Sequence, residues 1–331
     1  MTFFRAIPHS LAILWRMVLV FPFMILAIIV FGIIAAFFVF IMAFISPILA
    51  VVIAIAFGVA TSVLPVIIGA RLGLQAKDSS VRNTYFGLML PAVGYGLFEA
   101  FCIVLIMAAA AGVYFVATPL TLQDLGRLAG VDEAILVEQL MSVDPAITLS
   151  LIWVGSVLMI GLRAALLMPF AGASIGADPG GRPHTPFYGF GSNFLSLLFV
   201  VAIAYILSAL AVPLAVAVCF LLGFGDSLAA AMVQLETTRG FGILDQLGLE
   251  TGVFIGLSLL FYIWAFSLQS AGGVIAYMTQ AEAVADQQNA FDMSMDEHLE
   301  SMSSSRPQMD RPMQSEDVME LIRSRMQQNK R

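Results

Sequence analysis

Long apolar stretches separated by short polar segments make up most of the chain between residues 17 and 280. No Asp, Glu, Lys or Arg occurs between Arg16 and Arg71, and this stretch is too long for one helix to cross a hydrocarbon core of about 30 Å. Ser46-Pro47 is the predicted break, because proline lacks the N–H group that a helix interior needs. The stretch therefore predicts two membrane spans.

Four further apolar stretches predict four more spans, over residues 86–117, 146–176, 193–223 and 251–279. The predicted fold class is all-α: a polytopic membrane helical bundle of about six transmembrane helices. The predicted domains are a cytoplasmic or interfacial N-terminus over residues 1–16, a transmembrane domain over 17–280 with outer loops 118–145 and 224–250, and a cytoplasmic tail over 281–331.

The composition narrows the class of protein. Apolar residues make up 60% of the chain and charged residues 11%, and the mean hydropathy is +0.96. Soluble domains have about 25% charged residues. A soluble enzyme, a nucleic-acid-binding protein and a disulfide-rich secreted domain are therefore disfavoured. We expect the lipid bilayer and either a membrane-protein partner or self-association as partners, and no nucleic acid.

The basic residues predict the orientation of the spans. Segments that alternate onto one side hold twelve of the fifteen basic residues, namely Arg5, Arg16, Arg71, Lys77, Arg82, Arg182 and six in the tail. The other side holds Arg127 and Arg239. Because basic residues are retained on the cytoplasmic side, both termini are predicted to be cytoplasmic.

The outer loops and the tail offer candidate contact surfaces. Both loops are acidic and predict short amphipathic helices, either as a docking surface for a cationic partner or as a solvated face. The tail has the polar composition of a disordered segment. It ends in a predicted amphipathic helix with an apolar stripe of Val318, Leu321, Ile322 and Met326. This helix is either a partner-binding helix or a helix that rests on the bilayer surface.

Two charged residues lie inside the predicted spans, Glu99 and Arg163. A charge at the bilayer centre costs about 2.5–3.5 kcal/mol on insertion scales, so we expect the two to pair. The pair is either a gate or polar substrate contact, or a neutralised pair that fixes the register of two helices. The span that holds Arg163 also carries a stripe of small residues, which predicts close helix packing: Gly161, Ala165, Gly172 and Gly176.

Catalytic motifs are weak. Gly172-Ala-Ser-Ile-Gly176 matches the hydrolase pattern G-x-S-x-G, but that pattern needs a strand–turn–helix setting, and no acid is evident to orient the nearby His184. The three histidines have no ligand spacing, and both cysteines lie in apolar stretches. We therefore expect no catalytic, cofactor-binding or metal-binding residues and no cofactor.

Residues 161–201 combine Arg163, five intervening residues, Pro169, and a connection containing Gly, Thr and Asn that re-enters an apolar span. This pattern resembles the bacterial multi-pass membrane domain associated with glycerophosphodiester phosphodiesterases. The resemblance implies a bacterial inner-membrane location and transfers no catalytic residue. The expected function is a non-enzymatic scaffold or subunit of a membrane complex. The alternatives are a small permease or channel component and an intramembrane enzyme, which would need Ser174 beside a base.

Overall fold

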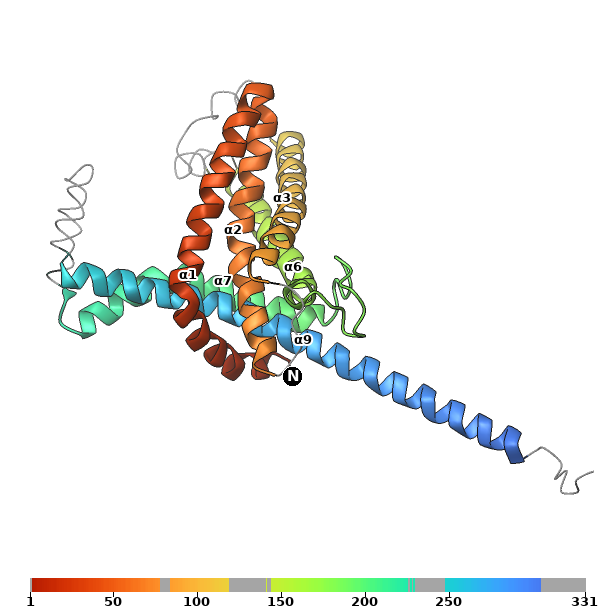
Figure 1. The fold of residues 1–331 in the computed structure, drawn as a ribbon. Helices are drawn as coiled ribbons and strands as arrows, with labels where there is room; N and C mark the ends of the chain where they lie inside the picture. The colour runs from red at the N-terminus through yellow and green to blue at the C-terminus, as the bar shows by residue number, and fades with distance from the viewer. Residues whose placement is uncertain are drawn as a thin grey trace, which may run out of the picture. The chain divides into compact units, whose positions relative to one another are not determined.

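The computed structural model describes residues 2–77, 84–118, 141, 144–225, 227, 229 and 248–304. Within these residues, six helices are long and apolar enough to cross a membrane, which confirms the predicted all-α class (Figure 1). The elements are α1 Thr2–Ile45, α2 Pro47–Gln75, the 3-10 turn η1 Phe86–Leu88, α3 Met89–Ala117, α6 Pro145–Ile175, α7 Phe194–Leu221 and α9 Leu249–Ser304.

Local sequence explains where several helices begin and end. Ser46 has an extended backbone and caps α2, with its hydroxyl accepting from the N–H of Leu49 at 3.4 Å, and Pro47 follows as the first helical residue. This confirms the predicted break. Asp144 caps α6 in the same way, because its Oδ1 accepts from two backbone N–H groups at 3.0 Å each. Gly176 ends α6 in the left-handed conformation, with φ of 76°.

The first three helices run alongside one another, and α6 packs against α2 and α3 (Figure 1). α1 and α2 form an antiparallel hairpin. Near one end of the hairpin, Arg16 Nη1 donates to the carbonyl of Leu72 at 3.2 Å. Farther along, the ring centroids of Phe31 and Phe57 lie 5.1 Å apart. α7 packs against α6, and Gly272 of α9 lies against α7.

The buried core is concentrated in one half of these helices. Its longest continuous runs of buried residues are 63–74 of α2, 163–175 of α6 and 267–274 of α9, and α1, α3 and α7 add buried residues such as Met17, Tyr95 and Leu197. The opposite halves carry exposed apolar side chains, for example Val116 at 91% and Leu221 at 86% exposure. Such surfaces are expected of side chains that face lipid rather than water.

Glycines allow the closest helix contacts within this core. A β-carbon at Gly273 of α9 would lie 2.5 Å from the backbone oxygen of Leu167 in α6, and one at Gly96 of α3 would lie 2.9 Å from the backbone oxygen of Ala56 in α2. Only glycine permits these approaches, as small residues do at membrane helix interfaces.

Two predicted boundaries lie inside helices. Residues 2–16 belong to the same helix as the first apolar stretch, because α1 begins at Thr2 and continues past the charge of Arg16. Residues 281–304 are not disordered, because α9 continues through them to Ser304. Their polar composition suggested disorder, yet they contain no Gly or Pro and are rich in the helix formers Ala, Glu, Gln and Met.

The chain divides into two units, Met1–Ala281 and Glu282–Arg331. In the second unit the described residues are the end of α9, with side chains exposed over residues 285–295. Several predicted features lie outside the described residues: nearly all of the outer loops 118–145 and 224–250, and the candidate partner helix with Val318, Leu321, Ile322 and Met326.

Candidate functional site

The first buried polar centre is the predicted pair of charges. Glu99 lies in the middle of α3 and Arg163 in the middle of α6, and Arg163 Nη1 donates to Glu99 Oε2 at 2.6 Å. Their side chains are only 6% and 2% exposed. The structure therefore brings together the two charges that the sequence places inside the spans.

Two further helices complete the coordination of Arg163. Its Nη2 donates to the carbonyl oxygen of Ser62 at 2.9 Å and to the hydroxyl of the same residue at 3.0 Å. Its Nε donates to Gln269 Oε1 at 3.2 Å. Ser62, Glu99, Arg163 and Gln269 form what we call the Arg163 cluster. It links α2, α3, α6 and α9, and every nitrogen of the guanidinium has a partner.

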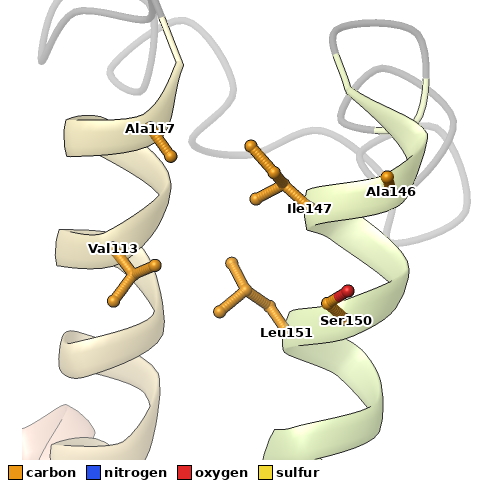
Figure 2. A pocket seen from close by; sticks show the side chains of 6 residues that line it. All are labelled: Val113, Ala117, Ala146, Ile147, Ser150 and Leu151. Carbon is orange, nitrogen blue, oxygen red and sulfur yellow. The ribbon is translucent and has the colours of Figure 1, made fainter.

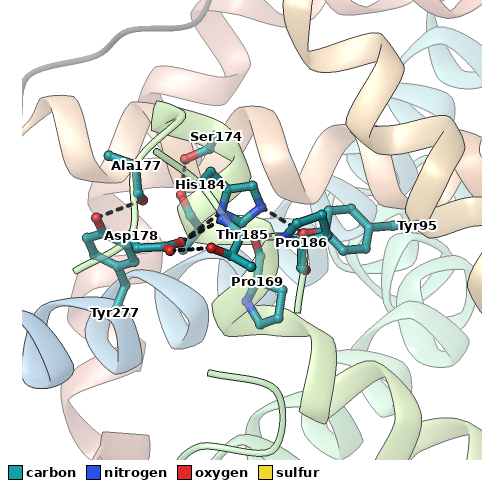
Figure 3. Close-up of polar contacts among 10 residues, drawn as sticks. Tyr95, Pro169, Ser174, Ala177, Asp178, His184, Thr185, Pro186 and Tyr277 are labelled. Atoms are coloured by element: carbon teal, nitrogen blue, oxygen red, sulfur yellow. Dashed lines mark hydrogen bonds and ion pairs between the residues drawn. The ribbon is translucent and has the colours of Figure 1, made fainter. Parts of the chain in front are cut away.

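The second buried polar centre lies beside the connecting segment, residues 177–193, between α6 and α7 (Figure 3). Asp178 organises this segment. Its Oδ1 accepts from the backbone N–H of Thr185 at 3.0 Å, and its Oδ2 accepts from the hydroxyl of Thr185 at 2.8 Å. His184 Nδ1 lies 3.3 Å from the same Oδ1. The opposite nitrogen, Nε2, lies 2.9 Å from the hydroxyl of Tyr95 in α3.

We call Tyr95, Asp178, His184 and Thr185 the His184 cluster. The Tyr95 hydroxyl also donates to the carbonyl of Pro186 at 2.6 Å. On the other side of the segment, the hydroxyl of Tyr277 in α9 donates to the carbonyl of Ala177 at 3.0 Å (Figure 3). The connecting segment is therefore tied to α3 and α9 as well as to the helices that it joins.

Burial determines the protonation of His184. Desolvation lowers the pKa of this imidazole below its usual value, and the neighbouring carboxylate of Asp178 opposes this shift without cancelling it. In the neutral tautomer whose Nδ1–H donates to Asp178, Nε2 accepts from the Tyr95 hydroxyl, and the single proton of that hydroxyl is then shared between Nε2 and the carbonyl of Pro186. Such an Asp–His–Tyr arrangement orients a proton acceptor. Since Tyr95 is 4% exposed, the arrangement fits a structural latch better than a reactive centre.

The two clusters meet at an aromatic contact. The ring of Phe170 in α6 lies 5.4 Å from the Cζ of Arg163 and 5.0 Å from the ring of Tyr95, in an edge-on arrangement. Tyr95 and Glu99 are one helical turn apart on α3, so they lie on one face of that helix. One face of α3 thus serves both clusters.

The connecting segment lies against the C-terminal part of the stripe of small residues on α6. A β-carbon at Gly172 would lie 2.8 Å from Nδ1 of His184. Pro169 lacks an N–H group, which leaves the carbonyl of Ala165 without its helical donor, and the N–H of Gly191 donates to that carbonyl at 3.2 Å. The nearest neighbour of Gly172 is therefore the connecting segment, and Gly176, which ends α6, accepts from the N–H of His184 in the same segment at 3.3 Å.

At the other end of the stripe, Gly161 lies against the side chains of Phe194 and Leu198 of α7. Here the predicted packing does involve a second helix. The difference follows from the position of each residue along α6. The connecting segment lies against the end of α6, and α7 begins only after it, at Phe194.

Asp178 is an acid that orients His184, which the sequence had not shown, but Ser174 lacks the setting of a hydrolase nucleophile. Ser174 lies inside a helix rather than on a strand–turn–helix, it is fully buried, and its hydroxyl donates to the carbonyl of Ala171 at 2.7 Å. Within the residues that the structure describes, no group of three or more His, Cys, Asp or Glu side chains could hold a metal ion.

Two apolar pockets border the helices. One, of about 270 Å³, lies between the ends of α3 and α6 and is lined by six residues (Figure 2): Val113, Ala117, Ala146, Ile147, Ser150 and Leu151. The other lies between α1, α2 and the start of α3. Neither is lined by Glu99 or Arg163.

Sequence reasoning found the pair of charges but missed most of their surroundings. Gln269 was detectable as an amide in an apolar span, where an unpartnered polar group is costly. The role of Asp178 was not detectable in this way, because it lies in a polar connection where carboxylates are common.

Comparison of the chain with protein-family models, curated proteins and solved structures finds no match. Over the part of the chain that the structure describes, the fold defines an all-helical protein with six helices long and apolar enough to span a membrane.

Proposed function

We propose that the chain is a non-enzymatic scaffold or subunit of a membrane complex. The observation that carries this proposal is the coordination of Arg163, whose three guanidinium nitrogens all have protein partners. Four hydrogen bonds fix the guanidinium to three neighbouring helices. A charge held in this way stabilises one arrangement of the helices, and its nitrogens are already engaged by the protein.

A small permease or channel component is the alternative function. It is favoured by the position of Glu99 and Arg163 in the middle of the spans, where intramembrane charges often mark transport pathways. Against it, a solute would have to displace partners of Arg163 that are already bound. Pro22, Pro65 and Pro169 also lie inside continuous helices rather than at the breaks that often line transport sites.

The absence of a role for Ser174 supports a non-enzymatic function, since its hydroxyl is bound to its own helix. We further propose that the chain lies in a bacterial inner membrane with both termini in the cytoplasm. The excess of basic residues in the N-terminus, the 71–84 loop and the tail supports this orientation. A reporter fused after Arg331 should be active only in the cytoplasm.

The experiment that tests the scaffold proposal is native mass spectrometry of the full chain purified in a mild detergent. We expect a complex of fixed stoichiometry, with another membrane protein or with a second copy. Replacing Leu321 and Ile322 together by Asp should reduce its recovery if the tail helix makes the contact, whereas Glu320→Gln should not. A monomer that moves ions or solutes into proteoliposomes would contradict the scaffold and support the permease.

A further inference from the structure

A buried arginine outside both clusters has no counter-charge among the residues that the structure describes. Arg71, in the last turns of α2, is 8% exposed, and its Nε and Nη1 have no hydrogen-bond partner. Its Cζ lies 3.9 Å from the centroid of the Tyr85 ring. Among the described residues it forms no ion pair. A guanidinium remains charged at any physiological pH, so a buried one without an anion is costly.

An open apolar groove of about 560 Å³ leads away from this arginine. It is lined by side chains between residues 20 and 30 of α1, by Leu64 and Ile68 of α2, and by residues 85–89 at the start of α3. Tyr85 belongs both to the groove and to the stack on Arg71. The groove is accessible from outside the helices, since Phe23 and Phe86 are 73% and 76% exposed.

The groove has one cationic end and one apolar end. Arg71 follows Ile68 by three residues, and Arg16 precedes Val20 by four, so each lies one turn beyond the groove on the face that lines it. The hydrogen bond from Arg16 to the carbonyl of Leu72 places these two turns together. From Val20 to Val30 the groove follows α1 for about 15 Å at 1.5 Å per residue.

That length equals half of a hydrocarbon core of about 30 Å, which is the depth of one lipid leaflet. We propose that the groove binds an anionic phospholipid, with its phosphate at Arg71 and an acyl chain between α1, α2 and the start of α3. The ligand supplies both features that the site requires. A phosphate provides a charge-assisted partner for the unpartnered nitrogens, and an acyl chain covers the apolar side chains. This inference does not depend on the proposed function.

The test uses the full chain in detergent, stripped of lipid and then titrated with phosphatidylglycerol, phosphatidylcholine or inorganic phosphate. Binding is followed by native mass spectrometry and by the melting temperature. The wild type should bind phosphatidylglycerol about tenfold or more tightly than phosphatidylcholine, because both lipids offer a phosphate to Arg71 but only phosphatidylcholine adds a cationic headgroup, which Arg71 and Arg16 would repel. Arg71→Gln should lose this preference. Arg182→Gln, which removes one exposed charge from the connecting segment, should keep it.

Two further measurements distinguish a bound phospholipid from a bound phosphate ion and from a general change in stability. Without lipid, Arg71→Gln should be as stable as the wild type or more stable, because it removes an uncompensated charge, and added phosphatidylglycerol should raise the melting temperature of the wild type only. Val30→Trp, at the apolar end of the groove, should weaken both lipids. Equal losses in Arg71→Gln and Arg182→Gln, equal binding of the two lipids, or full protection by inorganic phosphate would each overturn the proposal.

Discussion

Replacing Glu99 by Gln should be among the most damaging single changes in the transmembrane region. The amide is close in size to the carboxylate and can still accept from Arg163 Nη1, so the substitution removes the negative charge and little else. Ser62 and Gln269 provide only neutral acceptors. Removing one member of a buried ion pair costs about 3–5 kcal/mol, and the retained hydrogen bonds place this change near 3 kcal/mol. That is a shift of roughly a hundredfold in the folding equilibrium.

Replacing Arg163 instead of Glu99 should destabilise the protein less. Arg163→Gln leaves the Glu99 carboxyl buried, but a carboxyl can become neutral by holding a proton, whereas a guanidinium cannot. We therefore expect Glu99→Gln to destabilise more than Arg163→Gln. The double variant contains no buried charge, so it should be more stable than the sum of the two single losses predicts, by about 2 kcal/mol.

The measurement is reversible unfolding in mixed micelles with increasing SDS, followed by helical circular dichroism and by the fluorescence of the three tryptophans. Glu282→Gln and Arg182→Gln are the matched controls, because they remove the same charges from exposed positions. The reasoning is refuted if both single variants at Glu99 and Arg163 unfold like the wild type, or if their losses are additive in the double variant.

Two other changes test the packing and the connecting segment. Gly273→Ala should destabilise the chain by about 1–3 kcal/mol, because its β-carbon would meet the backbone oxygen of Leu167. Gly256→Ala, whose β-carbon would have nothing within 4 Å, should be neutral or stabilising. The same SDS titration should therefore show a loss of stability only for Gly273→Ala. The pKa of His184 is lower in the folded chain than its usual value, so the unfolded chain binds more protons and stability should fall as the pH drops below about 6.5. Melting temperatures at pH 7.5 and pH 5 should therefore differ less in His184→Gln than in the wild type, and an unchanged difference would contradict the predicted role of this histidine.

The spans were predictable because one physical rule decides them. An apolar stretch of sufficient length has to form a helix in lipid, since backbone polar groups have no water to bond there. The break at Ser46-Pro47 was predictable because proline lacks the N–H group that a helix interior needs. The start of α1 and the end of α9 were not predictable, because a helix can continue into polar sequence wherever no residue stops it, as it does from residue 281 to Ser304.

The two polar clusters differ in how far sequence could reveal them. Glu99 and Arg163 are 64 residues apart but stand alone as charges in apolar spans, so the cost of leaving either unpaired predicted their contact. Tyr95 and His184 are 89 residues apart, and neither is costly by itself. Their contact depends on the path of the connecting segment over Gly172, which no spacing in the sequence specifies.

The partners of Arg163 are synthesised in a fixed order, so the Arg163 cluster has to form in steps. When α6 enters the bilayer, Ser62 and Glu99 already exist, so the guanidinium can be neutralised at once. Gln269 is made 106 residues later and can bind only after α7 and the first part of α9, residues 249–269, have emerged. The partly inserted domain would thus already have its buried charge paired, and α9 would complete the cluster with a hydrogen bond from an uncharged side chain.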